Sequence, residues 1–165
     1  MIGGEVRSDG PHQVFIAAKG SPTPKDQAAS LAIGSLSLGS ATGLEVRAGW
    51  DLASVTVTNP DASIGSVIVG VEWHSGTILA GVNFDATAIE PDDITSPNGG
   101  NPEIVSAISR IAIGRAAYGT MGGDDRFVFA AERVLSVIVD RMRVPLTGGT
   151  ASLGITGDFK VRSIS

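Results

Sequence analysis

The sequence contains no cysteine, and charged and aromatic side chains are scarce: 18% of its 165 residues are charged and 5% are aromatic. A chain without cysteine forms no disulfide, no cysteine-ligated zinc or iron–sulfur centre and no thiol nucleophile. A charged fraction below the usual value of about 25% leaves much of the surface neutral, which favours contacts with other subunits.

Long apolar runs are also missing. No stretch approaches the ~18 consecutive apolar residues of a transmembrane helix. The first residues, Met-Ile-Gly-Gly-Glu, do not place a basic segment before an apolar one, as a signal peptide does. We therefore expect a soluble protein that has no membrane partner.

Basic residues are absent from a long central stretch. Between Arg47 and Arg110 there is no lysine or arginine, whereas eight acidic residues lie there: Asp51, Asp61, Glu72, Asp85, Glu90, Asp92, Asp93 and Glu103. Residues 1–100 carry 4 basic and 11 acidic side chains, a balance of −7, and residues 101–165 carry 8 and 6, a balance of +2. This separation suits subunits that meet acidic side to basic side, although pairing of the two regions inside one fold also explains it.

The residues that are abundant indicate β-structure. Glycine accounts for 22 of the 165 residues, against an average of about 7%, and apolar and polar residues alternate along 51–58, 66–74 and 78–84. Ser75-Gly76 lies between the last two segments and has the form of a two-residue hairpin turn. We expect a mainly β protein, an antiparallel β-sandwich of the jelly-roll type.

One segment has the features of a helix. Asn101-Pro102-Glu103 offers an N-cap, a proline at the first helical position and an acid in the first turn. Apolar residues then follow at helical spacing, so one helix is predicted at about 101–118. The segment 124–144 fits either a helical stripe or a buried strand, and its many β-branched residues favour the strand.

The first 43 residues differ from the rest of the chain. They contain Gly20, Pro22 and Pro24 and then recurring serine and glycine, which leaves little apolar surface to bury. We predict an extended Gly/Ser/Pro-rich arm over 1–43, with a short strand at 13–18, that obtains its order from neighbouring protein. A β-sandwich domain is predicted over 44–165.

The sequence predicts no catalytic residue and no metal or cofactor site. His74 is a candidate base, but His12 is the only other histidine and there is no G-x-S-x-G elbow. We interpret His74 as a surface or interface residue; the enzymatic alternative is a hydrolase that pairs it with Glu72 or Asp85.

Two charged regions have binding alternatives. The carboxylates of the loop 85–93 are close enough in sequence to bind calcium, but they lack the spacing of an EF-hand and equally fit a solvated or partner-facing loop. The basic residues after 125 alternate with acids and have few aromatic neighbours, so we expect no specific nucleic-acid binding.

Two segments resemble those of bacteriophage and viral virion structural β-proteins: Val55-Thr-Val-Thr-Asn-Pro-Asp61 and Gly148-Gly-Thr-Ala-Ser-Leu-Gly-Ile-Thr-Gly157. Proteins of this kind are often cysteine-free sandwiches whose Gly/Ser-rich arms reach to neighbouring subunits. The resemblance implies a capsid cement, decoration, spike or connector role in a virion, and it assigns no functional residue.

The sequence therefore favours a structural protein over an enzyme. We expect a homo-oligomer that binds itself and other capsid-like subunits and stabilises a larger particle. The candidate interface residues are Leu31, Ile33, Leu36, Leu38, Trp73 and His74. The alternative is a carbohydrate- or receptor-binding β-sandwich that uses loop residues near Trp73, His74 and Asp92, which requires an exposed tryptophan.

Overall fold

A computed structural model of the chain describes residues 4–8, 14–21, 28–51, 56–84, 94–95, 99–120 and 127–164. Eighteen β-strands and no helix are found among these residues. The expectation of a mainly β protein is confirmed. None of the described residues forms a helix long and apolar enough to cross a membrane.

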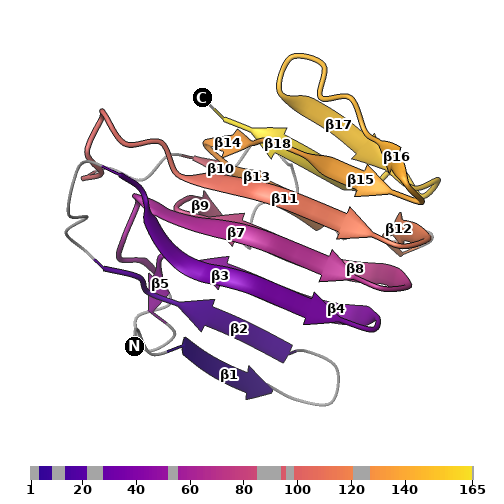
Figure 1. The fold of residues 1–165 in the computed structure, drawn as a ribbon, viewed down its shortest axis with the longest axis horizontal. Coiled ribbons are helices and arrows are strands. Elements are labelled where there is room, and N and C mark those ends of the chain that lie inside the picture. The colour runs from indigo at the N-terminus through magenta and orange to yellow at the C-terminus, as the bar shows by residue number, and fades with distance from the viewer. Residues whose placement is uncertain are drawn as a thin grey trace.

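Most strands belong to two sheets whose neighbouring strands run mainly parallel (Figure 1). Sheet A has the order β1-β2-β4-β8-β13-β18-β17, and β12 also pairs with β8. Its parallel strands are β2 (Val14–Ala18), β4 (Ala41–Ala48), β8 (Glu72–Ala80), β12 (Ala116–Tyr118), β13 (Phe127–Ala131) and β18 (Phe159–Ser163). Antiparallel strands form its two edges, β1 (Gly4–Ser8) and β17 (Thr150–Leu153).

Sheet B has the order β3-β7-β11-β15-β16, and β14 also pairs with β11. Its parallel strands are β3 (Ser30–Leu38), β7 (Ala62–Val69), β11 (Ala107–Ile113), β14 (Arg133–Val134) and β15 (Val137–Val139). At one edge β16 (Met142–Arg143) is antiparallel to β15. Two short pairs complete the described strands: β5 (Trp50–Asp51) with β6 (Thr56–Val57), and β9 (Asn83–Phe84) with β10 (Ile94–Thr95).

The chain passes from sheet B to sheet A through short turns, which gives a stack of arches. Strand β3 turns at Gly39 into β4, β7 turns at Gly70 into β8, and β11 turns at Gly114 into β12. Each arch pairs in register with the next one, so the colour in Figure 1 changes steadily from the indigo strands to the yellow ones. This is the arrangement of a two-sheet β-solenoid, in which each unit contacts its neighbours in the stack.

Sheet B is built from four copies of one seven-residue pattern. The pattern reads IGSLSLG from residue 33, IGSVIVG from 64, ISRIAIG from 108 and VLSVIVD from 134. Its first, fourth and sixth positions carry Ile, Leu or Val and pack in the central core, in columns that run through the stack. The two residues between the first and fourth positions break the period-2 alternation at the same place in every strand.

The core lies between the two sheets, where the inward residues of sheet A meet those columns. Trp73, Phe129 and Phe159 are each fully buried there. The ring of Phe129 meets the ring of Trp73 edge-on at 5.3 Å and that of Phe159 at 4.7 Å. Such edge-to-face pairs add about 0.5–1.5 kcal/mol each to the free energy gained from burial.

The predicted antiparallel sandwich is wrong, because the alternating pattern that indicates strands does not distinguish parallel from antiparallel neighbours. The predicted hairpin at Ser75-Gly76 lies inside the continuous strand β8. Glycine is present there for a different reason: a Cβ on Gly76 would lie 2.4 Å from the carbonyl oxygen of Leu44 on the neighbouring β4. Gly76 is therefore needed because β4 and β8 approach closely there, and not because the chain turns.

The predicted helix at 101–118 is also wrong. The side-chain oxygen of Asn101 accepts a hydrogen bond from the Glu103 N–H, and its carbonyl accepts one from Ile104, which closes a single turn. The chain then enters β11, where Ile108, Ile111 and Ile113 are buried. β-branched residues fit a strand better than a helix, and the parallel neighbours β7 and β15 bury them on both sides.

The expected N-terminal arm is part of the body of the fold. Strand β2 pairs with β4, β3 pairs with β7, and residue 43 lies within β4. The described part of residues 1–43 therefore obtains its order from the same chain, and no neighbouring subunit is needed to explain that order. The predicted short strand at 13–18 corresponds to β2.

The outer face of sheet A is covered by chain that links the arches. Trp50 of β5 and Ile94 of β10 pack there against Leu79 and Ala130, and all four side chains are buried. The guanidinium of Arg47 lies 4.3 Å from the Trp50 ring centroid, in a cation–π contact. The part of sheet A around Leu79 and Ala130 is thus buried on both faces, as parallel sheets usually are.

Candidate functional site

The outer face of sheet B differs from that of sheet A because no described residues cover it. Two registered rows of side chains cross it: Ser35, Ser66, Arg110 and Ser136 in one, and Ser37, Ile68, Ala112, Ile138 and Arg143 in the other. Ile68 is 42% exposed between the buried Val67 and Val69, and Leu135 is 48% exposed. We call this surface the sheet B face.

The sheet B face mixes small polar and aliphatic side chains and carries two positive charges. Serine, alanine and isoleucine fill most of its positions, and the charges in the two rows come from the exposed Arg110 and Arg143. A parallel sheet with one bare face is unusual. A surface that combines exposed aliphatic residues with few charges is typical of a contact with another protein.

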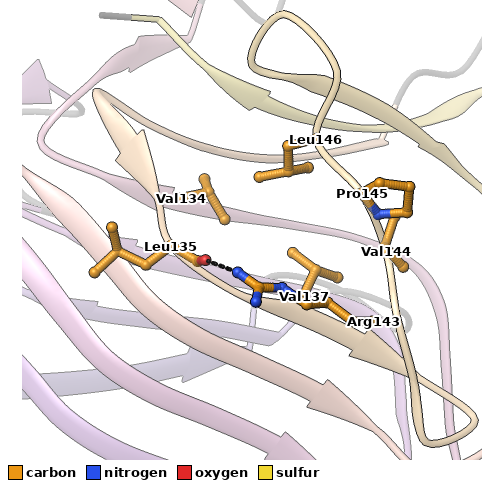
Figure 2. Close-up of a pocket in the computed structure, with 7 residues that line it drawn as sticks. All are labelled: Val134, Leu135, Val137, Arg143, Val144, Pro145 and Leu146. Atoms are coloured by element: carbon orange, nitrogen blue, oxygen red, sulfur yellow. Dashed lines mark hydrogen bonds between the residues drawn. The ribbon is translucent and has the colours of Figure 1, made fainter.

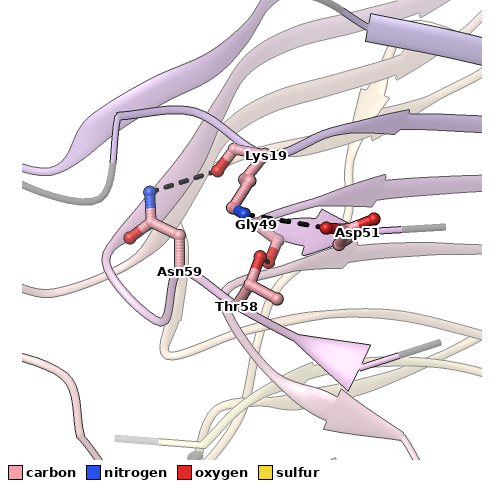
Figure 3. A network of polar contacts seen from close by, with 5 residues as sticks. All are labelled: Lys19, Gly49, Asp51, Thr58 and Asn59. Carbon is pink, nitrogen blue, oxygen red and sulfur yellow. Dashed lines mark hydrogen bonds and ion pairs between the residues drawn. The ribbon is translucent and has the colours of Figure 1, made fainter. Parts of the chain in front are cut away.

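A buried polar network joins the loops at the end of the arches opposite the Gly39 turn, and Figure 3 shows part of it. The Asn59 amide nitrogen donates to the carbonyl oxygens of Lys19 (3.2 Å) and Ser21 (2.8 Å), and its amide oxygen accepts from the Asp61 N–H (3.2 Å). Asn59 is 1% exposed. Buried amides that are fully hydrogen bonded fix a local conformation, so we assign this network a structural role.

Replacing Asn59 by alanine is expected to destabilise the protein by roughly 1–3 kcal/mol, because buried carbonyl and N–H groups lose their partners. Lys19→Ala is the control, since its ion pair with Asp51 is exposed (48% and 36% of the two side chains) and such pairs contribute about 0–1 kcal/mol. Urea unfolding followed by circular dichroism measures both changes. Equal effects would show that the amide network does not hold the loops.

A second site candidate surrounds His74, on the sheet A side of the arch turns. The His74 and Tyr118 ring centroids lie 4.8 Å apart with the ring planes tilted by 45°, and the Tyr118 hydroxyl donates to Glu72 Oε2 at 2.9 Å. They border a hollow of about 470 Å³ whose lining is mostly apolar: His74, Ala116, Ala117, Tyr118, Gly119, Gly154, Ile155 and Thr156. Glu72 is therefore bonded to a tyrosine, and no described carboxylate is hydrogen bonded to His74.

The hydrogen bond to Glu72, followed by desolvation and the Glu72 charge, raises the pKa of Tyr118 above its ordinary value of 10.0. Tyr118 is the chain's only tyrosine, so its phenolate absorbance can be titrated without interference. We expect Glu72→Ala to lower the titration midpoint toward the ordinary value. The pKa of Tyr118 is higher in the folded protein than in the unfolded chain. The hydrogen bond to Glu72 therefore stabilises the fold fully below about pH 10, and this stabilisation is lost as the pH rises through the folded-state pKa. An unchanged midpoint in the variant would contradict the bond.

A second hollow, of about 480 Å³, lies where the chain leaves sheet B after β16 (Figure 2). It is lined by Val134, Leu135, Val137, Arg143, Val144, Pro145 and Leu146. The Arg143 guanidinium donates to the Leu135 carbonyl at 3.5 Å, a long hydrogen bond. The hollow adjoins the sheet B face through Leu135 and Arg143, and we treat it as the rim of that face.

The structure places the six predicted interface residues in different environments. Leu31 is 57% exposed, Ile33 belongs to the core, and Leu36 and Leu38 are half-buried with their side chains against the core. His74 is half-buried beside Tyr118, and Trp73 is fully buried.

Trp50 is only 4% exposed, so neither tryptophan of the chain offers the exposed ring that the carbohydrate-binding alternative requires. The four carboxylates of the acidic loop 85–93, for which calcium binding and a solvated or partner-facing loop are the alternatives, lie outside the described residues, as does His12: Asp85, Glu90, Asp92 and Asp93. Among the described residues no three His, Cys, Asp or Glu side chains form a group that could hold a metal ion.

The fold defines a class of protein, a β-solenoid of stacked parallel arches, and no described residue covers the sheet B face. Comparison with protein-family models, curated protein sequences and solved structures gives no match to this chain. The resemblance to virion proteins therefore stays a prediction.

Proposed function

We propose that this chain is a structural component that self-associates through the sheet B face and thereby builds a larger assembly. The observation that supports the proposal is the contrast between the two sheets of one molecule. Sheet A is covered on its outer side by Trp50, Ile94 and their neighbours, whereas sheet B leaves Ile68 and Leu135 exposed. The solenoid itself would serve as a rigid spacer.

The size of the face sets the expected strength of association. Four strands about 4.8 Å apart and about seven residues long present a patch of roughly 450 Å². Two patches packed face to face bury about 900 Å², which is at the lower end of specific interfaces. One contact is therefore weak, and a stable assembly depends on many contacts made at once.

Sedimentation velocity over a range of protein concentrations tests the proposal. The unmodified chain is expected to show concentration-dependent association that Ile68→Arg abolishes, because the substitution places a charge at the centre of the face. Ile155→Arg is the matched control: Ile155 is 98% exposed but lies in the turn after β17, away from the face. A chain that remains monomeric up to its solubility limit, or equal effects of the two variants, would exclude the proposal.

A further inference from the structure

We infer that the free edge of β3 is a docking site for one extended strand from another polypeptide, with aliphatic side chains at alternate positions. This edge is separate from the sheet B face. In sheet B, β3 pairs with β7 on one side and with no described strand on the other. At the start of β3 the Ser21 N–H donates to Ser30 Oγ, and the register shifts between Leu31 and Ile33. From Ile33 to Leu38 no described strand pairs with this edge, which leaves six residues that can accept a strand by β-augmentation.

The hydrogen-bonding groups at this edge can be assigned from the register. The Gly70 N–H donates to the Leu38 carbonyl, and the Gly114 N–H donates to the Val69 carbonyl. Because backbone groups alternate between the two neighbours of a parallel strand, Leu36 and Leu38 direct theirs to β7. Ser35 and Ser37 therefore direct their N–H and C=O groups to the free edge.

The core is also incomplete beside β3. Val67 and Val69 of β7 are at most 1% exposed, whereas their register partners Leu36 and Leu38 on β3 are only half-buried. Sheet A continues past this point, because β2 and β1 extend beyond β4, the strand that faces β3 in the same arch. The continuation leaves a step beside β3 that the inner side of β2 covers, and Val14 of β2 is 38% exposed there.

The stack specifies the chemistry of the missing strand. The interfaces of β3 with β7, of β7 with β11 and of β11 with β15 are all parallel and use the same columns of Ile, Leu and Val. A strand on the free edge would form a fourth interface of this kind. It therefore needs an aliphatic residue at every second position opposite Leu36 and Leu38, and it would run parallel to β3.

A second copy of this chain does not supply that strand. Two copies joined by antiparallel β3 edges in one continuous sheet would have both A sheets on the same side, so β4 of one copy would occupy the place of β2 of the other. At the opposite end of the stack, sheet B finishes with the two-residue antiparallel β16. The ligand is therefore a strand without a solenoid attached at that edge.

Glycine provides a way to block the edge without disturbing the fold. A Cβ on Gly65 would lie 2.3 Å from the Gly34 carbonyl oxygen, so at this position of the stack the added atom points toward the preceding strand. The equivalent Cβ on Gly34 meets nothing within 4 Å. Gly34→Ala is therefore expected to be silent in the free protein and to collide with the backbone of a docked strand.

The test uses a fluorescent peptide with the sequence of residues 62–71, flanked by lysines for solubility, because this strand precedes β11 in sheet B as a docked strand would precede β3. Fluorescence anisotropy should show binding to the unmodified chain. Gly34→Ala and Ser37→Pro, which removes an edge N–H, should each weaken binding at least ~10-fold, a loss of about 1.4 kcal/mol or more. Ser37→Ala and Ile68→Arg should bind normally, and thermal melts should show that all four variants fold.

The inference is overturned if the peptide does not bind, or if it binds Gly34→Ala and Ser37→Pro as tightly as it binds Ser37→Ala. It is equally overturned if Gly34→Ala abolishes self-association of the chain, since the edge would then be occupied by a second copy. The two proposals can fail separately. Ile68→Arg is expected to lose self-association, which tests the proposed function, while it still binds the peptide, which tests the β3 edge.

Discussion

Replacing Phe129 by alanine is expected to destabilise the protein by about 3–5 kcal/mol, the largest effect of any substitution considered. The ring is fully buried and meets two other buried rings, those of Trp73 and Phe159. Its removal forfeits the transfer free energy of the ring and leaves a cavity that rigid neighbours cannot fill. For a chain of this length the loss corresponds to a fall in melting temperature on the order of 10 °C.

Phe127 is the matched control for this substitution. It lies on the same strand, two residues away, and is only partly buried against the core. Phe127→Ala is expected to cost clearly less than Phe129→Ala in calorimetric or urea unfolding. If the two variants were equally destabilised, the core would not be centred on the aromatic cluster.

The second large effect concerns strand spacing. Gly65→Ala is expected to destabilise the protein by about 1–3 kcal/mol, the usual cost of overpacking, because the new methyl group would lie 2.3 Å from the Gly34 carbonyl oxygen. Gly34→Ala is expected to stay within about 0.5 kcal/mol of the unmodified chain. Neither glycine has a positive φ, so backbone strain does not distinguish them. The difference between the two losses of stability therefore comes from the presence or absence of a neighbouring strand beside the new methyl group.

Urea unfolding of the two alanine variants measures that difference. The pair is informative because the glycines occupy the same position in successive copies of the repeat. Equal destabilisation of both variants would mean that a further strand already lies beside β3. No destabilisation in either would mean that β3 and β7 are not stacked as described.

The sequence predicts the presence of strands well, but it predicts how those strands pair poorly. Alternation along 66–74 indicates strand structure, but a turn at Gly70 divides this segment between β7 and β8, which lie in different sheets. β-branched residues correctly favour strand over helix after 127. Parallel pairing is not predicted, because it depends on which strand lies alongside and not on the residues within one strand. The repeat carries this information: IGSLSLG at 33 and IGSVIVG at 64 are identical at four of seven positions, but the copies at 108 and 134 are less similar and follow at unequal intervals.

The two errors at 101–118 and 1–43 have physical causes. The cap residues at Asn101 do form a turn, but one turn is stabilised too little to continue against a strand that buries Ile108 and Ile111 on both sides. In the N-terminal segment, serine and glycine indicate flexibility in isolation, whereas in a stack they allow close approach of β3 to β7. Tertiary contacts decide both cases.

The candidate surface could be predicted only in part. Leu31 is an expected contact residue and is exposed, whereas neither Ile68 nor Leu135 is among the expected contact residues. In the sequence each lies beside Val67 or Val134 in an apolar run, and only the register shows which side chains point outward. For Trp73 the error is the reverse: it is predicted to be an interface residue because of its size, but its side chain is fully buried in the core.

Disulfide formation between paired cysteines tests the parallel, in-register stack most directly, and the chain has no cysteine of its own to interfere. Ser35 and Ser66 are register partners whose hydroxyl oxygens lie 3.1 Å apart, so the double variant S35C/S66C should form an internal disulfide under mild oxidation. The shifted pair S37C/S66C lies about two residues out of register, roughly 7 Å along the strand, and should not. Rapid bridging of the first pair alone is the predicted result, and failure of the first pair or equal bridging of both would contradict the stacked fold.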